Sequence, residues 1–420
     1  MSGRGDFIAL AVAQTFSISG TRLSVIAIPW LVLTVTGDPL LTGLVVFAEM
    51  APYVLAKALG GPLIDRVGPR RVSILGDFFG LFAVGAIPLL AAFDLLSVSL
   101  LFPLVALVGL LQGPADAAKH ALVPVVARRA GLPLERVTGV VGTIERLAST
   151  VGAGAAGALV ALVGPAMALS FNAVTLGIAA VILLVGVRPG TREVAEADEP
   201  KAKTSYGSEL KEGFAFLRGD AVLVGIAVMV AVTNLLDQAY AAILVPVWAQ
   251  EGGRGAETLG LVFAVMSGFS VLGAMVATAL GEKMPRLPVY VGAFMIISLP
   301  RFAVFAFDAP LAGILATLAV GGFASGFLNP ILSAVILERI PEKLVGRVSS
   351  LVTASAWALM PFGGIFGGAL IAGFGLSAAF WVAGVCYLAM TLMPLVFKRF
   401  RGFSERPLEA GRRATGAADV

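Results

Sequence analysis

The chain has 420 residues and a formal net charge of +4; 58% of its residues are hydrophobic and 13% are charged. Soluble domains carry about 25% charged residues, so this chain has too few polar side chains to cover a soluble globule, which excludes a soluble enzyme or a disordered protein. The single cysteine excludes an intrachain disulfide, and the single histidine excludes an HExxH zinc site and a histidine cluster. No GK[ST] phosphate loop occurs, so we expect no ATP hydrolysis by the chain itself. We also expect no cofactor and no metal. The composition is typical of a polytopic membrane protein.

Apolar windows long enough to cross a bilayer, about 20 residues each, occur twelve times along the chain. They cover residues 7–35, 41–63, 72–93, 97–117, 137–163, 166–187, 221–248, 258–280, 287–307, 310–334, 348–372 and 376–397. The first window is too long for a cleaved signal peptide, and we expect it to remain in the protein. The windows predict an all-α integral membrane protein with twelve transmembrane helices.

Lysine and arginine are distributed very unevenly about these spans. Of the 30, we place Arg254 alone in a loop on one side, four inside helices, and the remaining 25 in loops and tails on the other side. The positive-inside rule then predicts that both termini are cytoplasmic, in a multi-pass protein of the cytoplasmic (inner) membrane. This topology explains the basic balance without a nucleic-acid partner, and the basic tail is expected to meet anionic lipid headgroups.

The middle of the chain breaks the apolar pattern. Residues 188–205 are rich in Pro, Lys, Glu and Asp, which predicts a cytoplasmic linker. Tyr206, Leu210, Phe214 and Leu217 then recur at helical spacing and predict a short interfacial helix. The expected organisation is an N-terminal six-helix bundle at 1–187, the linker with its helix at 188–219, a C-terminal six-helix bundle at 220–398 and a cytoplasmic tail at 399–420.

The two halves of the chain are repeats of each other. A shift of 211 residues places Gly152, Gly157 and Gly164 on Gly363, Gly368 and Gly375. A shift of 217 residues places Pro29 on Pro246 and Gly43-Leu44-Val45 on Gly260-Leu261-Val262. Duplicated six-helix halves predict a substrate site between the repeats, near the middle of the bilayer, with alternating access by rocking.

A loop motif follows the second span. It reads Gly61-Pro62-Leu63-Ile64-Asp65-Arg66-Val67-Gly68-Pro69-Arg70-Arg71. It resembles the cytoplasmic signature of the major facilitator superfamily, G-x-L-x-D-R-x-G-R-[RK]-[RK], and departs from it at Pro69. The resemblance covers nearly the whole chain and implies two pseudo-symmetric six-helix bundles. The corresponding loop of the second half, around Gly281-Glu282-Lys283, is degraded.

Three further motifs are similar to the twelve-span exporter branch of that superfamily, which includes macrolide-efflux and enterobactin-export proteins. They are Ala27-x-Pro29-Trp30-Leu31, Gln112-Gly113-Pro114 and Ile340-Pro341-Glu342…Gly346-Arg347-Val348. Two features depart from the antiporter pattern. The arginine expected three residues before Gln112 is Gly109 here, and the GP…GG motif of the fifth span reads Gly152-Ala153…Ala156-Gly157. The resemblance alone therefore does not imply antiport.

Ionisable residues inside the spans are the candidates for chemistry, because a charge in hydrocarbon is costly unless it faces a cavity or a partner. Arg22 lies seven residues before Pro29, and Asp237 lies nine residues before the equivalent Pro246. The repeat thus places opposite charges at nearly the same depth. Two interpretations remain open: Asp237 binds a proton or a cation in a cavity that Arg22 shares, or the two residues form a fixed ion pair between the halves.

The second span carries a polar stripe. Glu49, Tyr53 and Lys57 recur every four residues, so they share one face of a helix. Glu49 is expected at a depth that Arg22 shares, where it either faces the cavity or pairs structurally. Lys57 lies near the cytoplasmic end of the span, and we expect its ammonium group to extend to the membrane surface.

Other polar residues complete the candidate cavity. Glu145 in the fifth span is the second candidate for the proton site. Asn234 shares a helix face with Asp237 and is placed to hydrogen-bond a ligand, and Gln238 follows directly in the chain. Arg301 lies near the outer end of the ninth span, where we expect it to anchor the helix at the membrane interface.

The resemblance also implies a conformational latch on the cytoplasmic side. Asp65 would lie at a helix N-terminus of the second half, and Arg66 would pair with Asp116. Both arrangements are physically reasonable, because a helix N-terminus stabilises a carboxylate and breaking one side of a buried pair is costly. The residues assigned to the latch are Gly61, Asp65, Arg66, Gly68, Arg70, Arg71, Asp77 and Asp116.

The sequence as a whole predicts a secondary active transporter: a monomeric, proton-coupled exporter of amphipathic small molecules such as drugs and antibiotics. Its expected partners are the substrate, protons and membrane lipids. A siderophore or lipid exporter, an importer and a uniporter remain alternatives, as does a non-transporting receptor or scaffold. An intramembrane enzyme would need a clustered metal or nucleophile site, which the sequence does not show.

Overall fold

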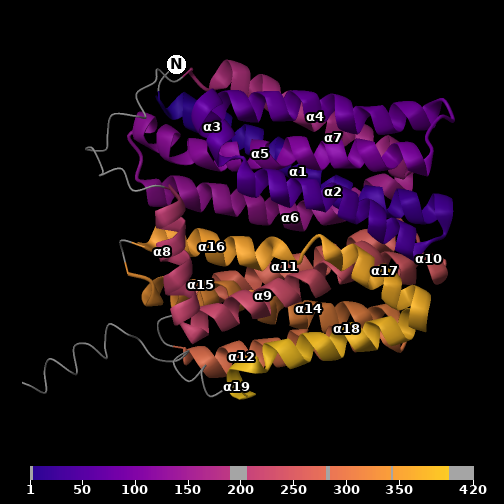
Figure 1. Ribbon diagram of the computed structural model, residues 1–420. Coiled ribbons are helices and arrows are strands. Elements are labelled where there is room, and N and C mark those ends of the chain that lie inside the picture. Colours follow the sequence, from indigo (N-terminus) through magenta and orange to yellow (C-terminus); the bar gives the residue numbers. More distant parts are fainter. Residues whose placement is uncertain (1–2, 190–205, 281–283, 342–343, 397–420) are drawn as a thin grey trace, which may run out of the picture. The chain divides into compact units, whose positions relative to one another are not determined.

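The computed structural model describes residues 3–189, 206–280, 284–341 and 344–396, and this part of the chain is helical without a β-strand (Figure 1). All twelve predicted spans are helical. Ten segments are long and apolar enough to cross a membrane, and Gly154–Val163 and Leu376–Thr391 are shorter apolar helices. The predicted tail at 399–420 and most of the predicted linker lie outside the described residues, as does the degraded loop at 281–283.

The elements form two compact units. One unit contains Met1–Ala195, Gln238–Ser267 and Pro361–Leu376; the other contains Glu196–Asp237, Gly268–Met360 and Ser377–Val420. The expected division into bundles at 1–187 and 220–398 describes the sequence repeats, and it stays a prediction. We refer to the two packed parts as unit 1 and unit 2.

Unit 1 is built around α1. Its helices are α1 (Gly3–Thr36), α2 (Pro39–Leu59), α3 (Gly61–Val67), α4 (Pro69–Ala92), α5 (Val98–Ala130), α6 (Leu134–Val163), α7 (Pro165–Gly186), the π-helix η2 (Tyr240–Leu244), α10 (Val245–Glu251), the first half of α11 (Ala256–Leu280) and α17 (Phe362–Phe374). α1 packs against α5, α6 and α7, and α4 packs against α5 and α7 (Figure 1). Leu10, Val126 and Leu183 are fully buried where α1, α5 and α7 meet.

Unit 2 contains the remaining helices. They are α8 (Tyr206–Gly219), most of α9 (Ala221–Ala239), α12 (Arg286–Ile297), α13 (Leu299–Ala306), α14 (Leu311–Ser325), α15 (Leu328–Arg339), α16 (Val345–Ala358), α18 (Leu376–Thr391) and α19 (Met393–Val396). The short helix predicted after the linker is therefore present as α8. It packs on α16, and its Leu217 is buried with Leu223, Ile340 and Val348.

Helix starts follow local capping chemistry. Asp38 accepts hydrogen bonds from the amides of Leu40 and Leu41 at 2.8 and 3.1 Å, and Pro39 occupies the first turn of α2. Asp220 does the same at the start of α9, with bonds from Val222 and Leu223 at 2.9 and 3.1 Å. A capping carboxylate satisfies amides that have no partner within the helix, so these residues define where the spans begin.

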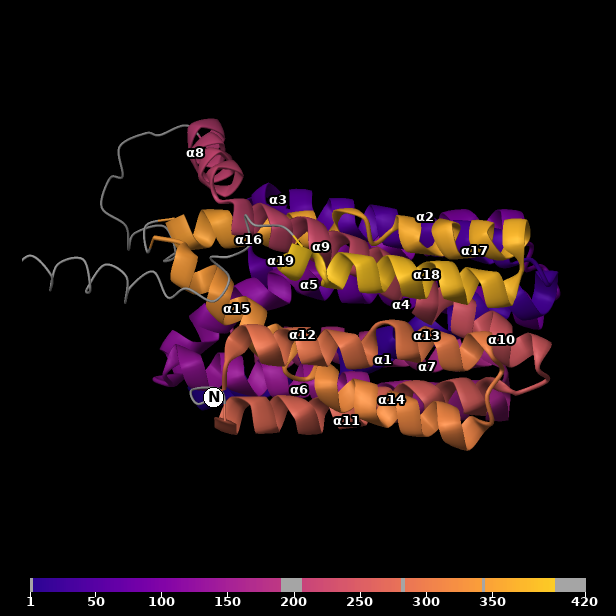
Figure 2. The same cartoon turned by 90° about the horizontal axis from the view of Figure 1, so that it is seen from below.

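Several predicted spans are broken by proline. Figure 2 shows the ninth span as two helices in succession, α12 and α13, which meet at Ser298 two residues before Pro300. A proline has no amide hydrogen for the preceding turn, and its ring crowds that turn. In unit 1, the π-helix η2 ends two residues before Pro246. Such interruptions in membrane helices are tolerated where they are covered by protein or line a cavity.

Glycines allow helices from the two repeats to touch in unit 1. A Cβ on Gly43 of α2 would overlap the carbonyl oxygen of Gly364 on α17, and one on Gly157 of α6 would overlap the Cα of Gly260 on α11. The 217-residue shift relates Gly43 to Gly260, so the same kind of contact occurs twice. We call these two contacts the glycine seam. Small residues permit close approach of membrane helices, which explains why the repeats share glycines.

We expect Gly43→Val to disfavour the conformation described here, because a branched side chain does not fit between α2 and α17. The measurement is the rate of cross-linking between cysteines introduced at exposed positions near the ends of α2 and α17. Gly142→Val is the matched control, because a Cβ at Gly142 meets no atom within 4 Å. Equal cross-linking rates in both variants and the parent protein would contradict a structural role for the seam.

Candidate functional site

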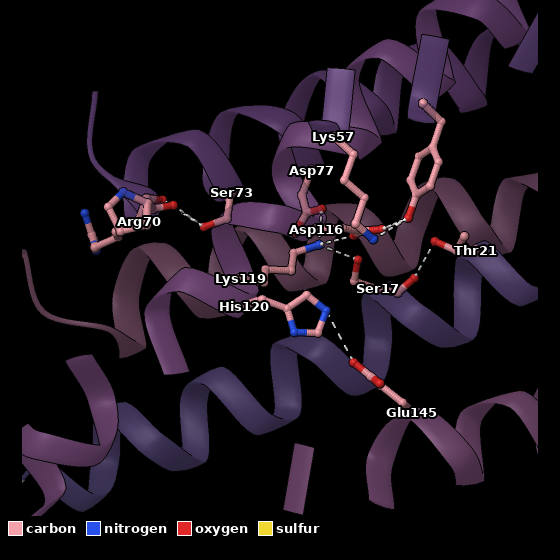
Figure 3. Close-up of polar contacts among 12 residues, drawn as sticks. Ser17, Thr21, Lys57, Arg70, Ser73, Asp77, Asp116, Lys119, His120 and Glu145 are labelled. Carbon is pink, nitrogen blue, oxygen red and sulfur yellow. Dashed lines mark hydrogen bonds and ion pairs between the residues drawn. The ribbon is translucent and has the colours of Figure 1, made fainter. Parts of the chain in front are cut away.

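A buried lysine organises the polar residues of unit 1. Lys119 on α5 is 3% exposed, and its ammonium donates to Ser17 Oγ at 2.6 Å and to Asp77 Oδ1 at 2.7 Å (Figure 3). Asp116 Oδ1, one turn earlier on α5, lies 3.7 Å from the same nitrogen. Three helices, α1, α4 and α5, thus meet at one ammonium group. We call Ser17, Asp77, Asp116 and Lys119 the lysine cluster.

The position of Lys119 corrects the sequence analysis. The fourth span was expected to end at residue 117, which counted Lys119 among the loop charges. α5 instead continues to Ala130 and ends at Gly131, whose φ of +64° suits a glycine cap. The apolar window underestimates the length of the helix. Polar residues on its inward face lower the mean hydropathy, but they do not end the helix.

Tyr53 connects the lysine cluster to α2. Its hydroxyl donates to Asp116 Oδ2 at 3.0 Å and accepts a bond of 3.0 Å from Lys57 Nζ. The polar stripe predicted on the second span therefore brings Tyr53 and Lys57 together. Lys57 was expected to extend to the membrane surface, and this expectation is wrong: its ammonium turns to the Tyr53 hydroxyl because a charge-assisted hydrogen bond is available there.

The Tyr53–Asp116 bond can be tested by a double-mutant cycle. We expect Tyr53→Phe and Asp116→Asn each to lower the thermal stability of the purified protein, and the double variant to lose less than the sum, because one interaction is lost only once. Thermal unfolding in detergent measures the effect. Tyr290→Phe combined with Asp116→Asn should be additive, because Tyr290 bonds Met229 in the other unit.

The tight contact between α2 and α5 explains one departure from the antiporter pattern. A Cβ on Gly109 would overlap the backbone carbonyl of Glu49, and one on Gly113 would overlap that of Tyr53. An arginine at position 109 does not fit this packing. Glu49 itself is half-buried on α2. Its predicted role at the cavity stays a prediction.

The signature loop forms α3 and the start of α4. Gly68 joins the two helices with a φ of +92°, and Pro69 occupies the first turn of α4, a position where proline favours a helix start. Arg70 donates to the carbonyls of Leu184 and Val187, both at 2.6 Å, and so caps the end of α7. The signature loop is therefore attached to the end of α7, more than 110 residues later in the chain.

The predicted Arg66–Asp116 pair is not found. Asp65 and Arg66 are exposed on α3, and within the described chain no ion pair joins Arg66 to Asp116. Asp116 is turned toward Tyr53 on α2 and Lys119 on α5 instead, and both of these side chains offer it a hydrogen donor. This is a correction of the pair expected from the resemblance. The latch role of Gly61, Asp65 and Arg71 stays a prediction.

Glu145 contacts the single histidine. His120 Nε2 on α5 lies 3.4 Å from Glu145 Oε1 on α6, and both side chains are exposed (Figure 3). No role was expected for His120 from the sequence. An ion pair exists there only when the imidazole is protonated. Glu145 as a proton site stays a prediction.

Unit 2 contains a second intramembrane ion pair. Arg301 on α13 donates to Asp237 on α9; the arginine is 3% exposed and the aspartate side chain 41% exposed. The guanidinium carbon lies 4.5 Å from the ring centre of Tyr387 and 4.7 Å from that of Phe302. Arg301 was expected to anchor α13 at the membrane interface, and this is wrong: Asp237 and the two rings hold it inside the unit.

The structure also shows where the other residues predicted around Asp237 lie. Asn234 donates to the carbonyl of Ala356 at 2.9 Å, so its amide joins α9 to α16. Gln238 is buried and belongs to unit 1. Arg22 also belongs to unit 1, where it is exposed on α1, and its predicted partnership with Asp237 stays a prediction.

Lys119, Ser17 and Tyr387 were not among the residues expected to act, and Arg301 was expected at the membrane interface. For Lys119 a signal existed: Asp116 and Lys119 are three residues apart, the spacing of an ion pair on a helix, and no glycine follows until Gly131. For Arg301 the signal was Pro300, which marks a break inside the span. No sequence signal joins Tyr387 to Asp237, because the two residues lie far apart in the chain.

Comparison with known proteins agrees with this architecture. The family model of the Major Facilitator Superfamily matches residues 10–253 and 227–418. The chain belongs to this superfamily. It is therefore a multi-pass membrane transporter and not an enzyme, and the resemblance seen in the signature loop is confirmed.

Similar members of the superfamily include proteins described as multidrug efflux pump Tap. The one from Mycobacterium tuberculosis is 28% identical over 420 residues, 99% of each chain, and that from Mycolicibacterium fortuitum is 28% identical over 404 residues, 95% of this chain and 97% of the relative. Among solved structures, the nucleoside transporter NupG matches with a TM-score of 0.70 at 12% identity, covering 94% of this chain and 99% of NupG. A D-xylose-proton symporter matches with a TM-score of 0.70 at 15% identity, covering 94% of this chain and 98% of the symporter. These structures show the fold alone.

Proposed function

We propose that this transporter exports amphipathic small molecules from the cytoplasm in exchange for protons. The observation that carries the proposal is its similarity, over 99% of both chains, to proteins described as multidrug efflux pumps. A match of this extent includes every predicted span. The corresponding location is the cytoplasmic membrane, with both termini in the cytoplasm, as the distribution of Lys and Arg predicts.

Asp237 is the proposed coupling group. Its carboxylate lies near the middle of the segment from Ala221 to Glu251 and is half exposed. The strength of its ion pair with Arg301 depends on how much water reaches the pair. If the two access states differ in that hydration, the proton affinity of Asp237 differs between them, and protonation biases the conformational equilibrium. This is the requirement for proton coupling.

The glycine seam supports alternating access. α2 and α6 come from the first repeat, and α17 and α11 come from the second, so the seam consists of contacts between repeats. In both contacts the two helix backbones touch directly, and no side chains interlock between them. The helices can therefore separate without leaving a cavity behind. In the proposed cycle they open as the repeats rock, while the signature loop with Gly61, Asp65 and Arg71 acts on the cytoplasmic side as a latch.

Transport by purified protein in proteoliposomes tests the proposal. The substrates are a panel of fluorescent amphipathic probes that are neutral, zwitterionic or cationic. We expect at least one of them to accumulate when the interior is acidic, and the accumulation to disappear with a protonophore. Accumulation driven by a sodium gradient, or equilibration without accumulation, would contradict proton coupling and favour the sodium-coupled or uniporter alternatives. Siderophore and lysolipid substrates in the same assay distinguish the remaining exporters from a drug pump.

A further inference from the structure

We propose that Arg301 sets the charge class of the substrate: by neutralising Asp237, it makes this site favour neutral and zwitterionic amphipaths over monovalent organic cations. The inference deepens the proposed function and rests on it, because it concerns the substrate of the same site. It starts from the asymmetry of the ion pair, in which Arg301 is 3% exposed and the Asp237 side chain is 41% exposed.

The surroundings of Arg301 are those that bind organic cations in proteins. A carboxylate together with aromatic ring faces attracts a cation by charge and by the ring quadrupole. Here the Asp237 carboxylate and the rings of Tyr387 and Phe302, at 4.5 and 4.7 Å, surround the guanidinium of the chain itself. The place that an organic cation would take is therefore already filled.

A cation from solution must compete with a tethered group. Arg301 is held on α13, one residue after Pro300, so its guanidinium stays next to Asp237 at a high effective concentration. Arginine is not deprotonated in proteins, and the two rings stabilise its charge independently of Asp237. Displacing it would leave a buried positive charge without its carboxylate, which is strongly unfavourable.

The charge of the pair supports the same conclusion in both protonation states. With Asp237 ionised the pair is neutral, and with Asp237 protonated it carries one positive charge. It never carries a negative charge, so a cationic substrate gains nothing from either state, whereas a neutral or zwitterionic molecule can still pack and hydrogen-bond at the half-exposed carboxyl group.

Two other ion pairs of unit 2 are each neutral by themselves. Asp220 pairs with Arg339 at 2.9 Å and Arg286 with Glu338 at 2.6 Å, so these four groups are already compensated in pairs. Asp220 begins the helix that carries Asp237, about 25 Å away by helix rise, and its charge is already balanced by Arg339.

The test compares two probes of similar shape and different charge. Methyltriphenylphosphonium is a permanent cation, and triphenylphosphine oxide is its neutral counterpart. Equilibrium binding to the purified full-length protein in nanodiscs gives the affinity ratio of the two probes. We expect the parent protein to prefer the neutral probe, and Arg301→Gln to raise the affinity for the cation relative to the neutral probe by about tenfold or more, since a net negative site is uncovered.

Two further variants complete the design. Arg301→Lys keeps the charge and should keep the preference for the neutral probe, and Arg301→Gln with Asp237→Asn carries no charge and should lose the gain in cation affinity. A parent protein that prefers the cation overturns the inference whether or not any variant folds. So does an unchanged ratio in folded Arg301→Gln. Because binding is measured without a gradient, these outcomes are independent of the transport assay that tests the proposed function.

Discussion

Asp237→Asn abolishes gradient-driven accumulation of substrate and leaves exchange of substrate across the membrane partly intact. This is the expected result because asparagine keeps the size and much of the hydrogen bonding of the side chain but binds no proton, so protonation can no longer bias the two access states. Accumulation under an imposed pH gradient and counterflow without a gradient, both in proteoliposomes, separate the two activities.

The matched control for Asp237→Asn is Asp220→Asn. Asp220 also pairs with an arginine, Arg339, but it lies at the start of α9 and caps that helix. Its replacement should lower stability and leave accumulation per folded protein unchanged. If Asp237→Asn still concentrates substrate at the level of the parent protein, the assignment is wrong, and Glu145 and then Glu49 become the residues to replace.

Lys119→Met lowers the free energy of unfolding by about 3–5 kcal/mol, the cost of removing one partner from a buried ion pair. The reason is that Asp77, which is 1% exposed, loses its cation, and Asp116 loses its neighbour on α5. Methionine is similar in length to lysine and apolar, so the loss reports the missing charge and not a cavity. Thermal and denaturant unfolding of the purified protein measure it.

A second replacement separates charge from packing. Lys119→Met combined with Asp77→Leu removes both buried charges and should recover most of the stability, because well-packed apolar residues replace buried ion pairs at little cost. Lys211→Met on α8 is the control, because Lys211 is exposed and surface substitutions change stability by less than about 0.5 kcal/mol. A Lys119→Met variant as stable as the parent would show that Lys119 is not the counter-ion of Asp77.

The two ion pairs bear on different properties of the transporter. Lys119 is enclosed by Ser17, Asp77 and Asp116 on three helices, so we expect its replacement to act mainly on the stability of unit 1. Replacement of Asp237 also removes the counter-ion of the buried Arg301 and so costs stability, but it removes in addition the group proposed to bind the proton, so we expect coupling per folded protein to be lost as well. A Lys119 variant that changes only coupling, or an Asp237 variant that changes only stability, would contradict this division of roles.

The spans and the family could be read from the amino-acid sequence. Both follow from local information: about 20 apolar residues are needed to cross a bilayer, and the signature loop from Gly61 to Arg71 is a contiguous motif. The repeats also showed which glycines correspond, for example Gly43 and Gly260. Proline alone did not indicate which spans are interrupted, because α1 continues through Pro29 and α5 through Pro114, whereas the ninth span is divided just before Pro300.

The partners of the intramembrane charges became known only from the packing of the helices. Arg301 looked like an interfacial residue by its distance from the end of the span, and Lys119 like a loop residue by the length of the apolar window. Their carboxylates, Asp237 and Asp77, lie on other helices, 64 and 42 residues away along the chain. Close helix packing also explains Gly109, where the backbone of Glu49 excludes the expected arginine. Hydropathy reports the transfer of a single residue into lipid, whereas an ion pair or a close contact depends on two helices whose relative rotation the sequence pattern does not specify.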